Sequence, residues 1–303
     1  MRSREPKPHH AATEAPIAGR EGPLRTLGTT ARAAARLDER VGRNPGRAML
    51  RLLLRARLAV RDLRRDHARY LAWLAHEFQA DAEALDAEYE HGAFRRDYLD
   101  RLASLHAAIG PQRIGTSDGW CLRALYLLVR ATRPRVVVET GVLYGASSAH
   151  LLAALDVNGE GKLYSIDLAH VAGEPPADYL VPGGLANRWT LVEGDSRREL
   201  PLLLPRLGPV DLFHHDSLHT FEHMTWEYQT ALPYLARQGV LSSHDVLWAH
   251  SLRRIFRRNA FPLFCDRHAL RWQTFQNNGF ARQEAVEPLW AERRFQAPVE
   301  RRG

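Results

Sequence analysis

Two short segments in the second half of the chain combine histidine and aspartate at spacings that suit proton transfer or metal binding. Asp216 and His219 lie three residues apart in the first segment, and His244 and Asp245 are adjacent in the second. Because histidine loses its proton near neutral pH, it can act as a general base. His219 is the first candidate for this role, and His244 is the second. Asp216, His244 and Asp245 offer instead oxygen and imidazole ligands for a divalent cation, which would lower the pKa of an acceptor hydroxyl.

A glycine-punctuated segment earlier in the chain is suited to ligand binding. It consists of a β-branched run, a carboxylate, two glycines four residues apart and a pair of serines: Val136–Val138, Glu139, Thr140, Gly141, Gly145, Ser147 and Ser148. This pattern predicts a buried parallel strand, a tight loop and the start of a helix. The helix N-terminus favours an anionic group, and the glycines let a ligand approach the backbone. The spacing matches neither a dinucleotide-binding loop nor a P-loop.

Acidic residues also follow the next two predicted strands. Asp167 ends the run Gly161–Asp167, where a carboxylate can accept hydrogen bonds from both hydroxyls of a ribose. Asp195 and Ser196 follow the run Trp189–Glu193. Each acid alone is typical of a helix cap. Ligands bind at the carboxyl edge of open parallel sheets, so we expect the acids together to face one ligand.

The glycine segment and the two His/Asp segments together resemble the class I S-adenosylmethionine (SAM) methyltransferases, in a branch that acts on small molecules. That family's E/D-x-G-x-x-x-G motif is matched by Glu139, Gly141 and Gly145. Its D-x-x-H-x-[YF]-E block after strand four is matched by Asp216, His219, Phe221 and Glu222. Its G-G-x-[ILV]-x-x-H-D-V block at strand five has Gln238 for the first glycine and is otherwise matched by Gly239, Val240, His244, Asp245 and Val246.

This resemblance covers about residues 110–280 and implies SAM as the cofactor. The helix N-terminus would take the methionine carboxylate, Glu139 would favour its ammonium group, and Asp195 would lie near the adenine. The cofactor-binding residues that the resemblance implies are Glu139, Thr140, Gly141, Gly145, Ser147, Ser148, Asp167, Asp195, Ser196 and Asp216. Metal-dependent relatives carry acidic residues after strands four and five, which places Mg²⁺ or another divalent cation at Asp216, His244 and Asp245.

The implied reaction is methyl transfer to a small-molecule acceptor, at oxygen, as in secondary metabolism. Oxygen is favoured because a histidine base or a cation suits the removal of a hydroxyl proton. Two other classes of protein stay open. One is a hydroxylase-associated protein with a similar cofactor site, and the other is a non-catalytic partner subunit that retains the fold.

The resemblance implies that the elements that position these residues form a Rossmann-like α/β domain, and we expect a seven-stranded class I methyltransferase sheet behind an N-terminal α-helical extension. We expect a disordered tail at 1–23, the helical extension at 24–109, the SAM-binding domain at 110–283 and a basic tail at 284–303. Asn277 and Asn278 lie between two short runs and predict a closing hairpin. The extension could cap the domain, pair two copies of the chain as a homo-oligomer, or present arginines to an anionic surface.

Composition bounds the remaining partners. The 303 residues carry a formal charge of +7, but 40 of the 42 basic residues are arginines spread along the chain, which argues against a specific nucleic-acid surface. Cys121 and Cys265 lie far apart, so a reducing compartment is expected. No apolar run is long enough to span a membrane, and the N-terminus lacks a secretory core. These features predict a cytoplasmic protein.

Overall fold

The computed structural model describes residues 64–110, 119–168, 173–246 and 259–282. The expected tails at 1–23 and 284–303 and the first part of the helical extension lie outside the described residues. Within the described part, no helix has the length and apolar composition that a membrane crossing requires.

In the part of the chain that the structure describes, seven strands form one mixed sheet in the order β3-β2-β1-β4-β5-β7-β6. The first five strands are parallel, and β7 runs antiparallel to both β5 and β6. This arrangement confirms the Rossmann-like seven-stranded sheet expected from the sequence. The strands are β1 Val136–Thr140, β2 Lys162–Asp167, β3 Trp189–Glu193, β4 Val210–His215, β5 Leu235–Ser243, β6 Arg271–Phe275 and β7 Asn278–Arg282.

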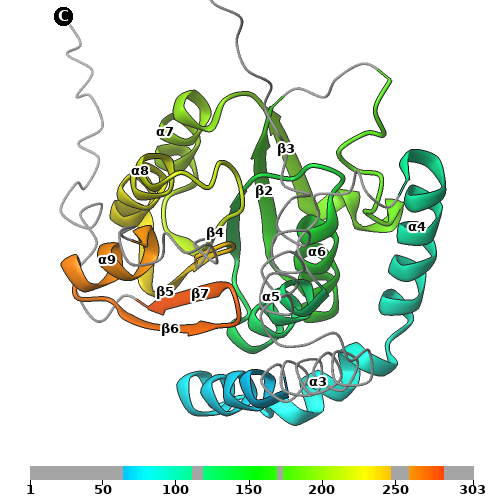
Figure 1. The fold of residues 1–303 in the computed structure, drawn as a ribbon, viewed down its shortest axis with the longest axis horizontal. Helices are drawn as coiled ribbons and strands as arrows, with labels where there is room; N and C mark the ends of the chain where they lie inside the picture. The colour runs from blue at the N-terminus through cyan, green and yellow to red at the C-terminus, as the bar shows by residue number, and fades with distance from the viewer. Residues whose placement is uncertain (1–63, 111–118, 169–172, 247–258, 283–303) are drawn as a thin grey trace, which may run out of the picture. The chain divides into compact units, whose positions relative to one another are not determined.

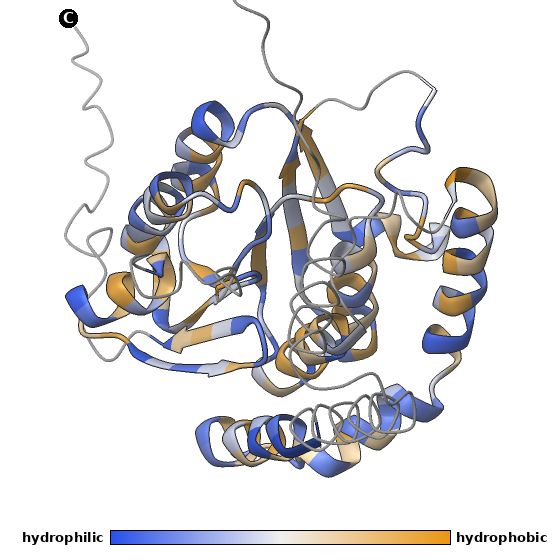
Figure 2. Ribbon diagram, viewed as in Figure 1, coloured by the Kyte–Doolittle hydropathy of each residue, from blue (hydrophilic) through white to orange (hydrophobic). Residues whose placement is uncertain are grey.

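Helices cover both faces of the sheet (Figure 1). Neighbouring residues of the central strands point to opposite faces, so Val137 and Leu212 join one apolar cluster while Val138 and Phe213 join the other. Apolar residues line the strands and the helices α5 and α6 (Figure 2). The first cluster involves α5 Gly119–Thr132 and α6 Ala146–Asn158; the second involves α7 Ser196–Leu207, α8 Phe221–Ala231 and α9 Ala260–Arg267. The described residues also include the short 3₁₀ segments η2 Gly183–Arg188 and η3 Leu232–Tyr234.

The described part of the N-terminal extension packs on α5 and α6. It comprises the helical residues 64–78, α3 Ala82–His91 and α4 Ala93–Ile109. The fully buried Tyr70 donates a hydrogen bond to the carbonyl of Ala124 in α5 at 2.7 Å. Arg130 of α5 forms an ion pair with Glu88 of α3 at 2.7 Å. These helices therefore share the hydrophobic core of the sheet domain.

The hairpin predicted near the C-terminus is present, with its turn one residue earlier than the sequence indicates. Phe275 pairs with Asn278, so Gln276 and Asn277 form the turn. Gln276 adopts a left-handed conformation with φ of 52°, and its N–H donates to Asp66 at 3.0 Å. Asn278 is buried as the first residue of β7.

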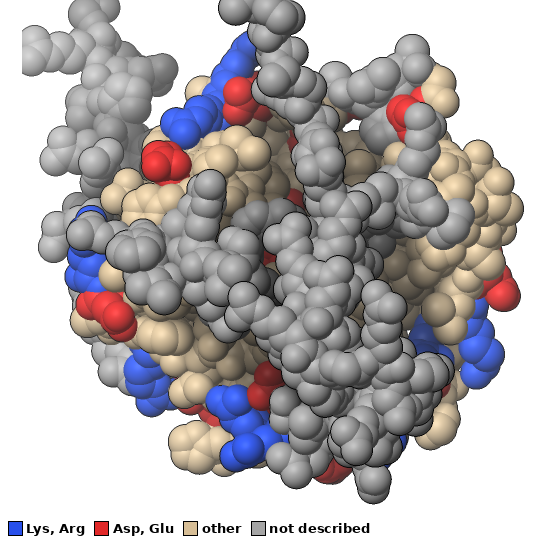
Figure 3. Space-filling model, in the orientation of Figure 1, with Lys and Arg blue, Asp and Glu red and all other residues tan. Residues whose placement is uncertain are grey.

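Charged residues of the described part are interspersed on the face drawn in Figure 3. Lys, Arg, Asp and Glu side chains appear there in small scattered groups where grey atoms do not cover them. Elsewhere on the described surface, oppositely charged side chains also pair, as Arg101 does with Asp97 at 2.9 Å. Mixed charge of this kind is typical of a solvated protein surface.

Candidate functional site

The ends of four parallel strands are joined by backbone hydrogen bonds that continue past the strands themselves. Gly141 N–H donates to Ile166 O at 2.9 Å, and Asp216 N–H donates to Thr140 O at 2.8 Å. His244 N–H donates to His215 O at 2.9 Å. The loops after β1, β2, β4 and β5 therefore meet at the carboxyl edge of the sheet, which is the edge where open α/β sheets bind ligands.

The two glycines predicted to approach a ligand are required by the backbone. Gly141 has φ of 88°, and a Cβ atom there would lie 2.3 Å from the carbonyl oxygen of Asp216. Gly145 has φ of 83°, and a Cβ atom there would lie 2.6 Å from Ala177 O. Gly145 is also the N-cap of α6, and because glycine has no side chain it offers no cap hydrogen bond to the first N–H groups of α6.

Glu139 is completely buried beside the start of α6. Its Oε2 accepts hydrogen bonds from Ser148 Oγ at 2.6 Å and from Ser165 Oγ at 2.8 Å. Its Oε1 has no hydrogen-bonding partner among the described residues. Burial raises the pKa of Glu139 to about 7, although the surrounding serines, Ser147 among them, oppose that rise. One carboxylate oxygen is therefore left to accept from a ligand.

Asp167 lies against the glycine loop. Its Oδ2 accepts from the backbone N–H groups of Val142 at 2.8 Å and Leu143 at 2.7 Å, and its Oδ1 accepts from Leu168 N–H at 2.8 Å. The carboxylate thus fixes the loop between β1 and α6. A contact between Asp167 and a ribose stays a prediction.

Asp195 and Ser196 begin α7. Asp195 is the N-cap, and its side chain accepts from Arg197 N–H at 2.9 Å, which is ordinary helix capping. Ser196 is buried, and its Oγ lies 3.2 Å from His223 Nε2. The proximity of Asp195 to an adenine remains a prediction from the family resemblance.

The structure brings the four residues of the two His/Asp segments together. Asp216 Oδ1 lies 2.9 Å from His244 Nδ1 and 3.3 Å from His219 Nε2. The other ring nitrogens face Asp245: His244 Nε2 lies 3.7 Å from Oδ1, and His219 Nδ1 lies 3.9 Å from Oδ2. Burial favours a raised pKa for Asp216, but hydrogen bonds from His219 and His244 hold its pKa well below the ordinary value. Each imidazole therefore lies between two carboxylates.

The same cluster offers ligands for a cation. Single atoms from Asp216, His219 and His244 lie within 4.8 Å of one another. The spacings of 2.9 and 3.3 Å suit hydrogen bonds, and they also suit ligands about 2.1 Å from a common metal ion. His219 joins Asp216 and His244 in this group, while Asp245, which accepts from Asn277 Nδ2, faces the outer ring nitrogens. The donor set fits a divalent metal that accepts imidazole.

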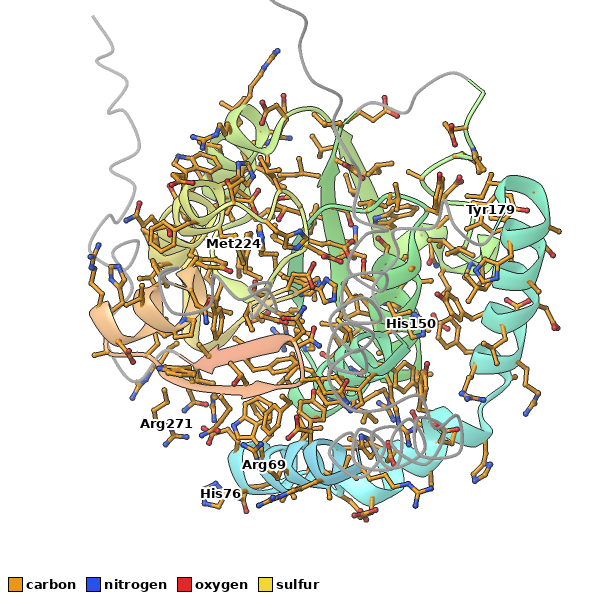
Figure 4. All side chains as sticks on the ribbon, in the orientation of Figure 1. Arg69, His76, His150, Tyr179, Met224 and Arg271 are labelled. Atoms are coloured by element: carbon orange, nitrogen blue, oxygen red, sulfur yellow. The ribbon has the colours of Figure 1, made fainter. Side chains whose placement is uncertain are left out.

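Sequence reasoning did not identify the buried polar residues behind these loops. Glu227 of α8 is fully buried and contacts His215 and His223, and His150 of α6 accepts from Tyr89 at 3.0 Å. Figure 4 shows His150 on the side of α6 that faces α4. Burial lowers the pKa of His150 to about 4. The spacing of His223 and Glu227, one helical turn apart in α8, is a signal in the sequence that could have identified this pair.

Comparison with known proteins supports the assignment of the fold. Residues 138–246 match the family model described as a methyltransferase domain. The crystal structure of cofactor-bound Rv0187 from MTB has a TM-score of 0.50 and 21% identity, with coverage of 67% of this chain and 95% of that one. The O-methyltransferase TomG from Streptomyces achromogenes, involved in tomaymycin synthesis and solved with SAM, has a TM-score of 0.49 and 20% identity, with coverage of 62% and 89%. No curated protein matches the chain in sequence.

Proposed function

We propose that this protein is a SAM-dependent methyltransferase that methylates a small-molecule acceptor, at oxygen. The observation that carries the proposal is the buried Glu139, whose Oε1 has no partner among the described residues, at the uncapped start of α6. These features lie within or next to the glycine loop, inside the segment that matches a methyltransferase domain. A zwitterionic amino-acid group would satisfy both, because its carboxylate suits the N–H groups and its ammonium suits Glu139.

SAM supplies an electrophilic methyl group on a sulfonium, so the protein has to hold the cofactor, orient the acceptor and remove its proton. Glu139 would accept from the ammonium group, and Asp167 from the ribose hydroxyls. Asp195 would accept from the adenine amine. Thr140, Ser147, Ser148 and Ser196 would shape the cofactor site from the ends of β1, α6 and α7.

His219 is the preferred proton acceptor. Its ring is part-buried, with Asp216 3.3 Å from Nε2 and Asp245 3.9 Å from Nδ1. Carboxylates on both sides stabilise the imidazolium that forms when the base takes a proton, as the aspartate does in a catalytic triad. His244 has the same pair of neighbours and is the second candidate.

A divalent cation is the alternative means of activating the acceptor. Asp216, His244 and Asp245 are the ligands predicted from the sequence, and the geometry adds His219. Such an ion would lower the pKa of the acceptor hydroxyl and orient its oxygen.

Calorimetry with S-adenosylhomocysteine tests the cofactor assignment. The wild-type protein is expected to bind at micromolar affinity, and Asp167→Ala to bind at least tenfold more weakly because hydrogen bonds to a charged carboxylate are lost. Asp156→Ala, which removes an exposed acid at the end of α6, is the matched control and should bind like the wild type. Undiminished binding by Asp167→Ala would refute the ribose assignment.

Turnover of SAM with phenols, sugars and hydroxy acids then separates the function classes. A methyltransferase forms a methylated product with one of these acceptors. Cofactor binding with no turnover on any of them would favour the hydroxylase-associated or partner-subunit class.

A further inference from the structure

Glu227 is a fully buried carboxylate for which the proposed reaction has no direct use. Each of its oxygens has two partners. Oε2 accepts from Thr140 Oγ1 at 2.5 Å and from His215 Nδ1 at 2.6 Å. Oε1 accepts from Ser217 Oγ at 2.9 Å and lies 2.9 Å from His223 Nε2. Such complete coordination by protein groups calls for an explanation, because a buried charge is costly.

Three of these four partners belong to the glycine segment at the end of β1 or to the segment around Asp216 at the end of β4. Thr140 directly precedes Gly141 of the glycine loop, His215 ends β4, and Ser217 follows Asp216. The segments touch here, because Asp216 N–H donates to Thr140 O at 2.8 Å and a Cβ on Gly141 would lie 2.3 Å from Asp216 O. A carboxylate bonded to both segments therefore fixes how one lies against the other.

The charge of Glu227 is maintained by its partners. Burial favours a raised pKa, but hydrogen bonds from His215 and His223 hold the pKa of Glu227 well below its ordinary value. An ionised carboxylate only accepts hydrogen bonds, so His215 must donate from Nδ1, which fixes the orientation of its ring. The His215 ring lies edge-on to His219, with 5.4 Å between ring centroids. By orienting His215, Glu227 therefore also affects the position of His219, the candidate base.

We propose that Glu227 is a positioning residue of the site. It holds the start of the glycine loop against Asp216 and Ser217. Through its hydrogen bond to His215 it also orients the ring that packs against His219. That these loops bind a cofactor rests on the proposed function. That Glu227 holds the loops together does not depend on the proposed function.

Glu227→Gln keeps the shape of the side chain and removes its charge, and Tyr70→Phe is the control because it removes one buried hydrogen bond between the N-terminal helices and α5. Hydrogen exchange of backbone amides, read by mass spectrometry, is measured with no ligand present. Glu227→Gln should speed exchange about tenfold in peptides containing Gly141 and Asp216, which corresponds to losing one hydrogen bond to a charged group. Exchange in α5 should not change, and Tyr70→Phe should show the opposite distribution.

S-adenosylhomocysteine binding supplies the second readout. Glu227→Gln should weaken binding about tenfold, while Tyr70→Phe lowers the melting temperature without weakening binding. A Glu227→Gln protein that loses stability but keeps both wild-type loop exchange and wild-type affinity would overturn the proposal. If that variant does not fold, Ser217→Ala removes one of the four bonds and should raise exchange at Asp216 alone; unchanged exchange there also counts against it. If the wild-type protein binds no S-adenosylhomocysteine, the proposed function is refuted. The exchange data would still decide whether Glu227 holds the two loops together.

Discussion

If Glu139 binds the ligand as proposed, a single proton on its carboxyl group links the stability of the protein to ligand binding. Burial raises its pKa to about 7 from an ordinary value of 4.5. The difference corresponds to about 3 kcal/mol between the protonated and ionised forms in the folded state. Because the folded protein holds this proton more tightly than the unfolded chain does, the associated stability is fully present below about pH 4.5 and is lost as the pH rises through 7.

Replacing Glu139 with glutamine removes this titration and keeps an oxygen that can accept from Ser148 and Ser165. Without ligand, Glu139→Gln should unfold like the wild type near pH 4.5. At pH 8 it should be more stable than the wild type by up to about 3 kcal/mol, since no charge is left in the dry interior. Urea denaturation at the two pH values measures the difference. A wild-type protein that is no less stable than the variant at pH 8 would contradict the raised pKa.

The same substitution should weaken ligand binding. An ammonium group next to Glu139 favours the ionised carboxylate, so binding of S-adenosylhomocysteine at pH 7 should release roughly half a proton from a group with a pKa of about 7. Calorimetry in buffers with different ionisation enthalpies measures this release. Glu139→Gln should abolish the release and lower affinity about tenfold or more. Equal proton release by the two proteins would refute the placement of the ammonium group at Glu139.

The remaining predictions concern how the acceptor is activated. His219→Ala should lower kcat by roughly 10²–10⁴ with nearly unchanged S-adenosylhomocysteine affinity if His219 is the base; loss of affinity instead would show that it belongs to the cofactor site. If the cluster binds a cation, EDTA should abolish turnover and Mg²⁺ or Mn²⁺ should restore it, whereas turnover that survives EDTA would exclude this alternative. Asp245→Asn should then be nearly as damaging as EDTA if Asp245 is a ligand, and much milder if it only faces the outer ring nitrogens of His219 and His244.

Apolar runs and turn residues predicted the individual strands and helices, and the family resemblance predicted the seven-stranded sheet that they form. Val137 and Val138 enter opposite apolar clusters because adjacent strand residues point to opposite faces, and this holds for any half-buried or fully buried strand. The sequence predicted a tight loop at Gly141, and the structure adds the reason for a glycine there: only glycine tolerates the φ of 88° and the contact with Asp216. The predicted position of the hairpin turn was wrong by one residue, because Gln276, rather than an asparagine, adopts the left-handed conformation.

Contacts between distant side chains could not be predicted in the same way. Glu227 reaches Thr140 across 87 positions in the chain, and Tyr89 reaches His150 across 61. Neither pair leaves a periodic signal, because the distance depends on how α8 and α3 are placed against the sheet. The convergence of His219 and His244 was foreseeable from neighbouring strands, whereas the position of Asp245 relative to their outer nitrogens required the backbone turn after β5.

Glu139 and Glu227 are both fully buried, yet their environments push their charges in opposite directions. Glu139 is surrounded by serine hydroxyls, which are neutral donors, so burial prevails and raises its pKa to about 7. Glu227 accepts from two imidazoles, and these hold its pKa well below the ordinary value. Glu227 has no acceptor capacity left for a ligand, whereas Glu139 Oε1 has no partner among the described residues. The carboxylate that is incompletely satisfied by the protein is therefore the one suited to recognise a cation on a ligand, and the saturated one is suited to hold the loops in place.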